Sequence, residues 1–388
     1  MLISYGKQSL DQSDIDSVIE ILKGDWLTQG PAIENFEHDL NQYFGSKFSC
    51  AVSNGTAALH LTGLCLGWGK NDIIITSPLT FLATANSIIY CGATPSFVDI
   101  DPKNYTIDPN RVEEKIKFHH NKGQKVKAII GIDYAGNPCD WKSLRSIANS
   151  YDVKLINDNC HALGASYEGS KQYGIKYADV ITQSYHPVKH ITTGEGGAIL
   201  SNDKEFIDLA RILRSHGMTK DPEFMINNDG PWYYEMIKLG YNYRLTDFQS
   251  ALGSSQLKRL DGFINKRRVI AKKYDTSFIE IKEFITPKVR SISNHGFHLY
   301  PLQIDFDGLE INKIAFFKKM YDNSINLQVH YIPIHLQPFY KKLFGSKKGD
   351  FPISEKFYEN EVSLPIYPDL LDKDVDNVIT KVLNFTSK

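Results

Sequence analysis

One lysine, Lys189, stands between two apolar runs in the stretch 178–203, and its surroundings could make it a nucleophile. The first run ends in β-branched residues at 180–181, the second covers 198–200, and a turn rich in threonine and glycine, 192–197, separates them. Two strands around a glycine-rich turn predict a hairpin whose backbone closely approaches another group. Apolar neighbours would desolvate the amine, and desolvation favours the neutral form that attacks a carbonyl group. From this stretch alone, a surface hairpin with an ordinary solvated lysine is the simpler interpretation.

Asp158 ends another candidate strand, 153–158, and so brings a carboxylate to the carboxyl edge of a sheet, where α/β folds bind ligands. A buried carboxylate without a partner costs on the order of several kcal/mol. Asp158 therefore implies either a cation opposite it or a role as the cap of a following helix, and the cap is the ordinary interpretation. His161, on its own, would be a hydrogen-bonded core histidine.

A candidate anion site lies at 53–56, where a turn of small residues joins a short strand at 51–52 to an apolar helix at 57–61. The free amides and the dipole of a helix N-terminus both favour a negatively charged ligand. Thr56 as a simple N-cap explains the same pattern equally well. Phe81, at the start of a later helix, would normally be a core residue.

Other chemistries find little support in the sequence. His295 and His298, and likewise His330 and His335, are close in sequence, but no carboxylates or thiols cluster with them to complete a zinc site. There is also no Gly-x-Ser-x-Gly elbow and no Walker loop.

The run from Ser184 to Lys189, followed by 191–197, resembles the signature of the DegT-type nucleotide-sugar aminotransferases. Those proteins are pyridoxal 5'-phosphate (PLP) enzymes of fold type I, and the lysine of this motif binds their cofactor covalently. The resemblance implies that Lys189 is the catalytic residue and that it moves a proton between the substrate carbon and the cofactor.

The resemblance also implies roles for residues elsewhere in the chain. In that family, amides at a Gly-Thr-Ala turn hold the PLP phosphate, an aromatic ring lies against the PLP ring, and the aspartate of an Asp-x-x-His motif pairs with the pyridine nitrogen. The implied cofactor contacts are Gly55, Thr56, Ala57, Phe81, Asp158, His161, Ser184 and, from the second chain of a homodimer, Asn242, with Arg244 as the alternative for that contact. The implied substrate contacts are Tyr5, Asp25, Trp26, Leu27, Thr28, His330, Tyr331, Ile332 and Pro333.

Several segments resemble one subgroup in particular, the UDP-4-amino-4,6-dideoxy-N-acetyl-β-L-altrosamine transaminases of pseudaminic acid biosynthesis. These segments are 26–30, 214–217, 298–301 and 329–335. The resemblance implies that L-glutamate donates an amino group to C-4 of a UDP-linked 4-keto-6-deoxy-N-acetylamino sugar. Alternatives are the C-5 epimeric (D-xylo) sugar, a dTDP-linked 4-keto sugar, or a 3-keto sugar. Relatives that dehydrate a sugar carry histidine in place of the lysine, so Lys189 argues against that chemistry. A non-enzymatic PLP-binding regulator is a distant alternative.

The elements that must position these residues follow from the order of apolar runs. Strands and helices alternate through the first part of the chain, which predicts an α/β fold with a mostly parallel sheet covered by helices on both faces. With 388 residues the chain should form two domains, and we place a large PLP-binding domain at 1–260 and a smaller α+β domain at 261–388. In the latter we expect strands at 298–304 and 325–331 and a final helix from about Asp372.

Composition limits the remaining classes. The net charge of −1 provides no field for nucleic acid or an anionic membrane, and five lysines within 115–127 fit a helix end and a solvated loop. Five widely spaced cysteines without a CxxC pair, and no long apolar stretch, indicate reduced thiols in a cytoplasmic protein.

Overall fold

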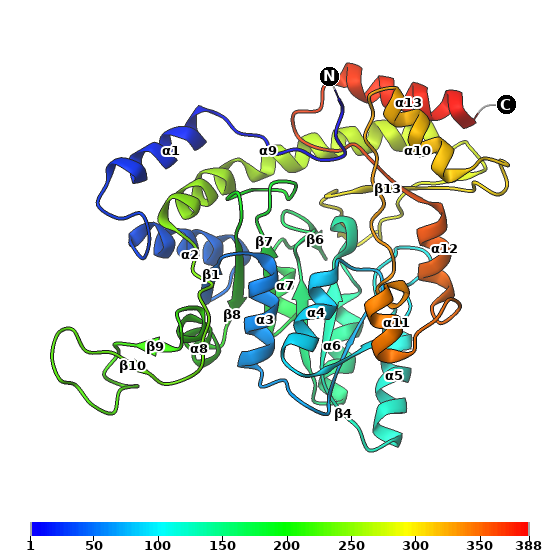
Figure 1. Cartoon of the computed structure of the whole chain (residues 1–388). Helices are drawn as coiled ribbons and strands as arrows, with labels where there is room; N and C mark the ends of the chain where they lie inside the picture. Colours follow the sequence, from blue (N-terminus) through cyan, green and yellow to red (C-terminus); the bar gives the residue numbers. More distant parts are fainter. Residues whose placement is uncertain (1, 387–388) are drawn as a thin grey trace.

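A seven-stranded sheet forms the centre of the larger part of the chain in the computed structural model, which describes residues 2–386 (Figure 1). Strand β8 runs antiparallel to both of its neighbours, β7 and β1, and the other neighbouring strands are parallel. The predicted hairpin and the mostly parallel sheet are therefore confirmed. The order is β1 (Phe48–Val52), β8 (Gly197–Ser201), β7 (Val180–Ser184), β5 (Lys154–Asp158), β4 (Lys125–Ile132), β2 (Asp72–Thr76) and β3 (Thr94–Phe97).

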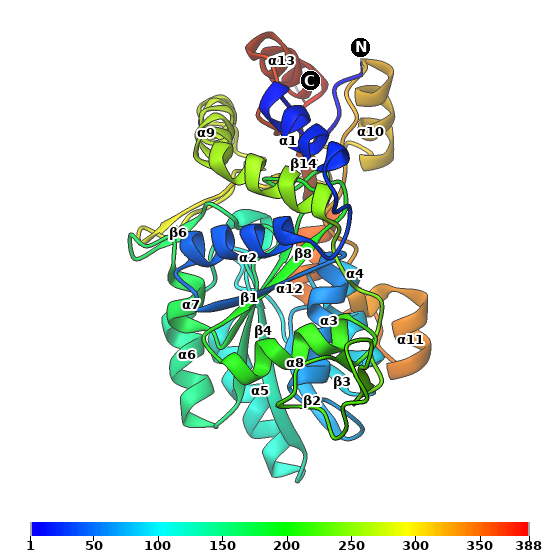
Figure 2. The same ribbon diagram turned by 90° about the vertical axis from the view of Figure 1, so that its left-hand side faces the viewer.

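Helices cover both faces of this sheet (Figure 2). Successive side chains of a strand point to opposite faces, and here the side chains on both faces are apolar, so both faces must be buried. Ile74 packs with helices α3 (Gly55–Cys65), α4 (Leu82–Tyr90) and α8 (Lys204–Arg214). Its neighbours Ile73 and Ile75 pack on the opposite face. That face is covered by α5 (Pro109–Asn121), α6 (Trp141–Ser150) and α7 (Tyr173–Tyr177), and further along the sheet by α2 (Pro31–Phe44).

The C-terminal part is a smaller α+β unit with its own core. A three-stranded antiparallel sheet has the order β11 (Phe284–Ile285), β13 (Tyr300–Ile304), β14 (Glu361–Leu364). Helices α10 (Lys313–Asp322) and α13 (Asp372–Thr386) pack on this core, and α12 (Pro352–Asn360) contacts β13. Helix α11 (Pro338–Phe344) instead packs through Tyr340 against Ala85 of α4 and Phe97 of β3 in the large part.

One helix, α9 (Asp247–Phe278), connects the two parts without a break. Leu260 belongs to the core of the large part, whereas Tyr274 belongs to the C-terminal core. The N-terminal Ile3 also joins the C-terminal core and pairs with Ile325. The division at 260/261 lies inside α9 and stays a prediction.

Some local expectations differ from the structure. The segment 325–331 is no strand and makes only isolated bridges at Ile325 and Gln328. Lys125 and Lys127 belong to strand β4 rather than to a loop. The short pairs β6–β12 (Ser166–Tyr167 with Ser293–Asn294) and β9–β10 (Met218–Thr219 with Glu235–Met236) were not predicted, because two-residue strands leave no periodic pattern.

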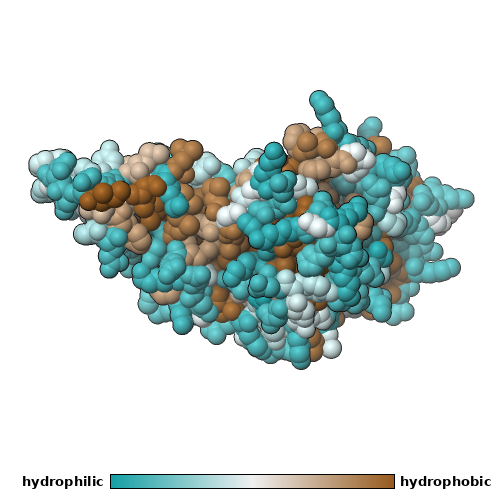
Figure 3. All heavy atoms as spheres, turned by 90° about the horizontal axis from the view of Figure 1, so that it is seen from below, coloured by the Kyte–Doolittle hydropathy of each residue, from teal (hydrophilic) through white to brown (hydrophobic). Residues whose placement is uncertain are grey.

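The β9–β10 hairpin projects from one end of the molecule and carries apolar side chains into solvent (Figures 1 and 3). The strongly exposed ones include Ile226, Trp232, Met236 and Leu239. Helix α1 (Gln12–Lys23), which starts after the cap Asp11, packs on α9. In the part of the chain that the structure describes, no helix combines the length and apolarity needed to cross a bilayer.

Candidate active site

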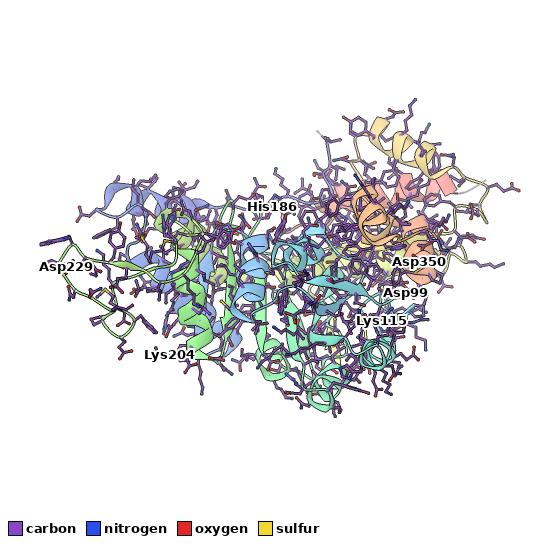
Figure 4. All side chains as sticks on the ribbon, turned by 60° about the horizontal axis from the view of Figure 1, so that its bottom comes forward. Asp99, Lys115, His186, Lys204, Asp229 and Asp350 are labelled. Carbon is purple, nitrogen blue, oxygen red and sulfur yellow. The ribbon has the colours of Figure 1, made fainter. Side chains whose placement is uncertain are left out.

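A cavity of about 1050 Å³ opens where β5 and β7 end, and it brings together residues from both parts of the chain. Figure 4 shows His186, one of its lining residues, near the middle of the molecule and far from Asp229 in the projecting hairpin. Residues predicted from the sequence that line it are Tyr5, Gly55, Thr56, Ala57, Phe81, Asp158, His161, Ser184, Lys189, His330, Tyr331 and Ile332.

Lys189 lies in the loop between β7 and β8, where its backbone N–H donates to the carbonyl of His186 at 2.8 Å. Burial lowers the pKa of the Lys189 amine, and the nearby Cys160 and Asp158 offset part of this effect. The desolvation expected from the sequence is thus present. A lysine of lowered pKa is more often in the neutral, nucleophilic form at neutral pH.

Asp158 ends β5 and is 5% exposed, and its carboxylate accepts hydrogen bonds from the Thr84 hydroxyl at 2.8 Å and the Cys160 N–H at 3.3 Å. No α-helix starts directly after Asp158, since the next described one is α7 at Tyr173, so the interpretation as a helix cap is wrong. No salt bridge to Asp158 forms among the described residues. The carboxylate therefore faces the cavity ready to pair with a cation.

The N-terminus of α3 also lines the cavity and forms an anion cradle there. Asn54, not Thr56, is the N-cap, and its side chain accepts from the Ala57 N–H at 2.8 Å. The amides of Gly55 and Thr56 precede the first intrahelical hydrogen bond and can donate to a ligand. A Cβ added to Gly55 would lie 2.8 Å from the Ser184 Cβ, so glycine lets the hydroxyl of Ser184 approach the cradle.

Two aromatic rings and a histidine also line the cavity. Phe81 is 54% exposed and its ring centroid lies 5.9 Å from that of Tyr331. His161 Nδ1 accepts from the Ala135 N–H at 3.3 Å, so the neutral ring donates from Nε2 to the Tyr331 hydroxyl at 3.0 Å. Burial is the main cause that lowers the pKa of His161 well below its usual range, and this keeps the ring neutral.

This constellation fits PLP. The cradle of amides and hydroxyls matches a phosphate, the Asp158 carboxylate matches a protonated ring nitrogen, and Lys189 lines the same cavity with a desolvated amine. Phe81 presents an exposed aromatic face for stacking against a flat ring.

Six predicted residues lie outside the cavity of this chain. Asp25, Trp26, Leu27 and Thr28 form an exposed loop, whose Leu27 carbonyl accepts from the Asp247 N–H at 3.0 Å. Asn242 is exposed and Pro333 is buried away from the cavity. Their roles at a site stay predictions, and for Asn242 the predicted contact is with the site of a second copy of the chain.

The sequence reasoning missed Thr84 and Cys160 as neighbours of Asp158, and Gln328 and Val329 in the cavity wall. Cys160 could have been found, because it belongs to the Asp-x-x-His motif. Thr84 could not, because its contact with Asp158 joins positions 74 residues apart.

The fold and site define a PLP-dependent aminotransferase. The chain belongs to the DegT/DnrJ/EryC1/StrS aminotransferase family, whose sequence model matches residues 8–383. Solved structures similar to this chain include the PLP form and the PMP form of Spr1654 from Streptococcus pneumoniae, with TM-scores of 0.89 and 0.90 at 26% and 28% identity. The PLP form matches over 100% of this chain and 99% of that chain, and the PMP form over 98% of each.

Relatives at similar identity carry different names. The UDP-4-amino-4,6-dideoxy-N-acetyl-β-L-altrosamine transaminase of Campylobacter jejuni is 38% identical over 388 residues, which cover 100% of this chain and 98% of the relative. The spore coat polysaccharide biosynthesis protein SpsC of Bacillus subtilis is 37% identical over 381 residues, 98% of this chain and 96% of the relative. The structure of Helicobacter pylori PseC, an aminotransferase of pseudaminic acid biosynthesis, matches with a TM-score of 0.89 at 32% identity and covers 99% of both chains.

Proposed function

We propose that this sugar aminotransferase transfers the amino group of L-glutamate to C-4 of a UDP-linked 4-keto-6-deoxy-N-acetylamino sugar. The product would be UDP-4-amino-4,6-dideoxy-N-acetyl-β-L-altrosamine, a precursor of pseudaminic acid. The observation that carries the proposal is the shared cavity: the segment 330–332, which belongs to a stretch that resembles the pseudaminic acid subgroup, lines the same cavity as Lys189. The similarity to the Campylobacter jejuni and Helicobacter pylori proteins supports it.

Different residues of the chain have different roles in transamination. When bound, PLP supplies an electron sink for the charge left on a carbon that loses its proton. Asp158, whose carboxylate accepts from the Thr84 hydroxyl, would hold a proton on the ring nitrogen by its charge. The Nζ of Lys189 takes the proton from the α-carbon of the amino donor and later returns one to C-4 of the acceptor. A positioned base of this kind contributes about 10²–10⁴-fold to the rate.

The sugar would lie against the wall formed by Tyr5, His330, Tyr331 and Ile332. Aromatic and aliphatic groups there can pack on a 6-deoxy methyl group, and the polar atoms of His330 and Tyr331 can bind ring oxygens. One misplaced methyl group changes binding by only about 1–3 kcal/mol. We therefore expect a clear but incomplete preference between sugars that differ only at C-5.

The test is a competition between the two C-5 epimeric UDP-ketosugars at equal concentration with the same glutamate supply. We expect the L-arabino epimer, which arises from UDP-N-acetylglucosamine by dehydration and C-5 epimerisation, to be aminated faster. A preference for the D-xylo epimer would overturn the sugar assignment, and the aminotransferase activity would remain. Analysis of the product configuration by NMR completes the assignment.

We further propose that the protein works in the cytoplasm as a homodimer with composite sites. Asn242 lies near the chain's surface and outside its own cavity, which fits a contact with the site of a second copy.

A further inference from the structure

Two fully buried residues of strand β14, Glu361 and Ser363, contact His330, the first at its backbone and the second at its ring. They lie two apart on the strand and therefore point to the same side. The backbone N–H of His330 donates to Glu361 Oε2 at 2.9 Å, and His330 Nδ1 lies 2.8 Å from Ser363 Oγ. The Ser363 hydroxyl in turn donates to Glu361 Oε1 at 2.5 Å.

This chain of contacts determines which ring nitrogen of His330 carries the proton. A serine hydroxyl can donate only one hydrogen bond, and in this arrangement Ser363 donates it to the Glu361 carboxylate. Ser363 can then only accept from His330, so Nδ1 must be the protonated nitrogen. The other nitrogen, Nε2, has no hydrogen-bond partner in the described part of the chain, and His330 lines the cavity. His330 thus presents a hydrogen-bond acceptor to whatever binds there.

We propose that Glu361 and Ser363 are positioning residues that set the tautomer of His330 and thereby decide whether it offers an acceptor or a donor to the ketosugar. The role at the sugar rests on the proposed function, whereas the tautomer itself does not. Tyr134 assists by donating its hydroxyl proton to the His330 carbonyl at 2.5 Å, which fixes the backbone of the same residue.

Protonation of Glu361 would reverse the donor and acceptor roles in the two hydrogen bonds that link Glu361, Ser363 and the His330 ring. The His330 N–H already occupies Oε2, so the added proton would reside on Oε1 and point at Ser363. The Ser363 hydroxyl would then turn to donate to Nδ1, and the His330 proton would move to Nε2. The cavity would meet a donor in place of an acceptor, with one proton taken up from solvent.

The surroundings place this change near physiological pH. Burial raises the pKa of Glu361 to about 8, although the Ser363 hydroxyl, the His330 N–H and Lys313 of α10 act in the opposite direction. The other titratable groups that interact with Glu361 are Tyr134 and Tyr331, which stay protonated because burial raises their pKa values. Burial and Lys189 lower the pKa of His330 to about 3, so its ring changes tautomer rather than charge.

Glu361→Gln is an informative variant because the glutamine mimics the protonated carboxyl group. Its Oε1 can accept from the His330 N–H and its amide can donate to Ser363, which then donates to Nδ1. We expect NMR of PLP-loaded, [¹⁵N]histidine-labelled protein to show His330 as the Nε2–H tautomer in Glu361→Gln at every pH. In the unmodified protein we expect Nδ1–H at high pH and a shift toward Nε2–H as the pH falls through about 8. His330→Gln assigns the signal.

A matched control is Glu355→Gln. Glu355 is also a buried carboxylate paired with a histidine, His335, at 2.8 Å, but neither residue lines the cavity. It should leave the His330 tautomer unchanged. Identical His330 tautomers in Glu361→Gln and the unmodified protein at high pH would overturn the proposal. Ser363→Ala removes the hydroxyl that links Glu361 to the His330 ring and leaves Glu361 unchanged. It should abolish the pH-dependent tautomer shift, and retention of that shift would also overturn the proposal.

The two half-reactions, followed by the absorbance of the bound cofactor, test the consequence for the sugar. Glu361→Gln should change the rate with the ketosugar about tenfold and remove its pH step, and the rate with glutamate should stay within about twofold. Equal losses in both half-reactions would overturn the positioning role. The NMR measurement needs no sugar, so a protein that rejects the proposed ketosugar would refute that substrate and leave the tautomer test intact.

Discussion

Asp158 ends β5 and Lys189 lies in the loop that follows β7, and because these two neighbouring strands are parallel, a base and an acidic group lie at one edge of the sheet. Both residues could be predicted from the sequence, because one ends an apolar strand, the other follows one, and each belongs to a local motif. Their supporting contacts could not be predicted. Thr84, on α4, and the pair Glu361 and Ser363, on β14, reach the site only through the tertiary fold.

At the residue scale, Lys189→Ala should abolish transamination, because the variant lacks both the covalent anchor and the base. Mass spectrometry after borohydride reduction should show no cofactor attached to the protein, with the melting temperature little changed. Lys115→Ala is the matched control: burial also lowers the pKa of Lys115, but this residue lies on α5, outside the cavity (Figure 4). A Lys189→Ala protein that still attached PLP covalently and turned over would refute the assignment.

Asp158→Ala should weaken PLP retention and lower turnover by about 10²-fold or more, because the ring nitrogen loses the charge that keeps it protonated. Asp158→Glu should recover little, since an extra methylene displaces the carboxylate from Thr84. The check is PLP affinity by fluorescence titration together with kcat. Normal turnover in Asp158→Ala would show that the carboxylate serves only the local loop structure.

At the scale of elements, the anion cradle depends on the close approach of α3 to the end of β7. Gly55→Ala would place a Cβ 2.8 Å from the Ser184 Cβ, which should cost about 1–3 kcal/mol of unfolding free energy and weaken PLP binding. Gly69→Ala is the control, because a Cβ added to Gly69 would meet no other atom within 4 Å. Urea unfolding and PLP titration provide the two measurements.

A second substitution separates the clash from the chemistry. Ser184→Gly removes the atom that Gly55→Ala would strike, so the double variant should regain stability relative to Gly55→Ala. PLP binding should stay weak, because the hydroxyl at the cradle is lost. Additive losses of stability would show that the two positions do not meet in the folded protein.

The sequence could predict the sheet and its helices because long apolar runs carry a strong periodic signal. It failed for the segment 325–331, where alternating residues suggested a strand. Only Ile325 and Gln328 form bridges there, because this segment turns from the C-terminal core toward the cavity wall. That turn is what brings His330 and Tyr331 to the site, and no local pattern encodes it.

At the scale of the whole molecule, the cavity is short of positive charge. Among the described residues that line it, Lys189 is the one lysine and there is no arginine. The proposed substrate carries a diphosphate and the donor two carboxylates, which require cations or many hydrogen-bond donors. A second copy of the chain is the natural source of further groups, and the exposed apolar hairpin 218–239 gives a surface that association would cover.

A mixing experiment tests whether the sites are composite. Lys189→Ala and Asn242→Ala chains should each be inactive alone. In a heterodimer, one site combines the intact Lys189 of one chain with the intact Asn242 of the other, and the second site lacks both. Random exchange of equal amounts should restore about a quarter of the activity of the unmodified protein, because half of the dimers are mixed and each holds one intact site. Each variant taken separately through the same dissociation and reassociation is the control. If the mixture stays inactive while mass spectrometry shows that heterodimers have formed, each site is built from one chain, and Asn242 acts within its own protomer.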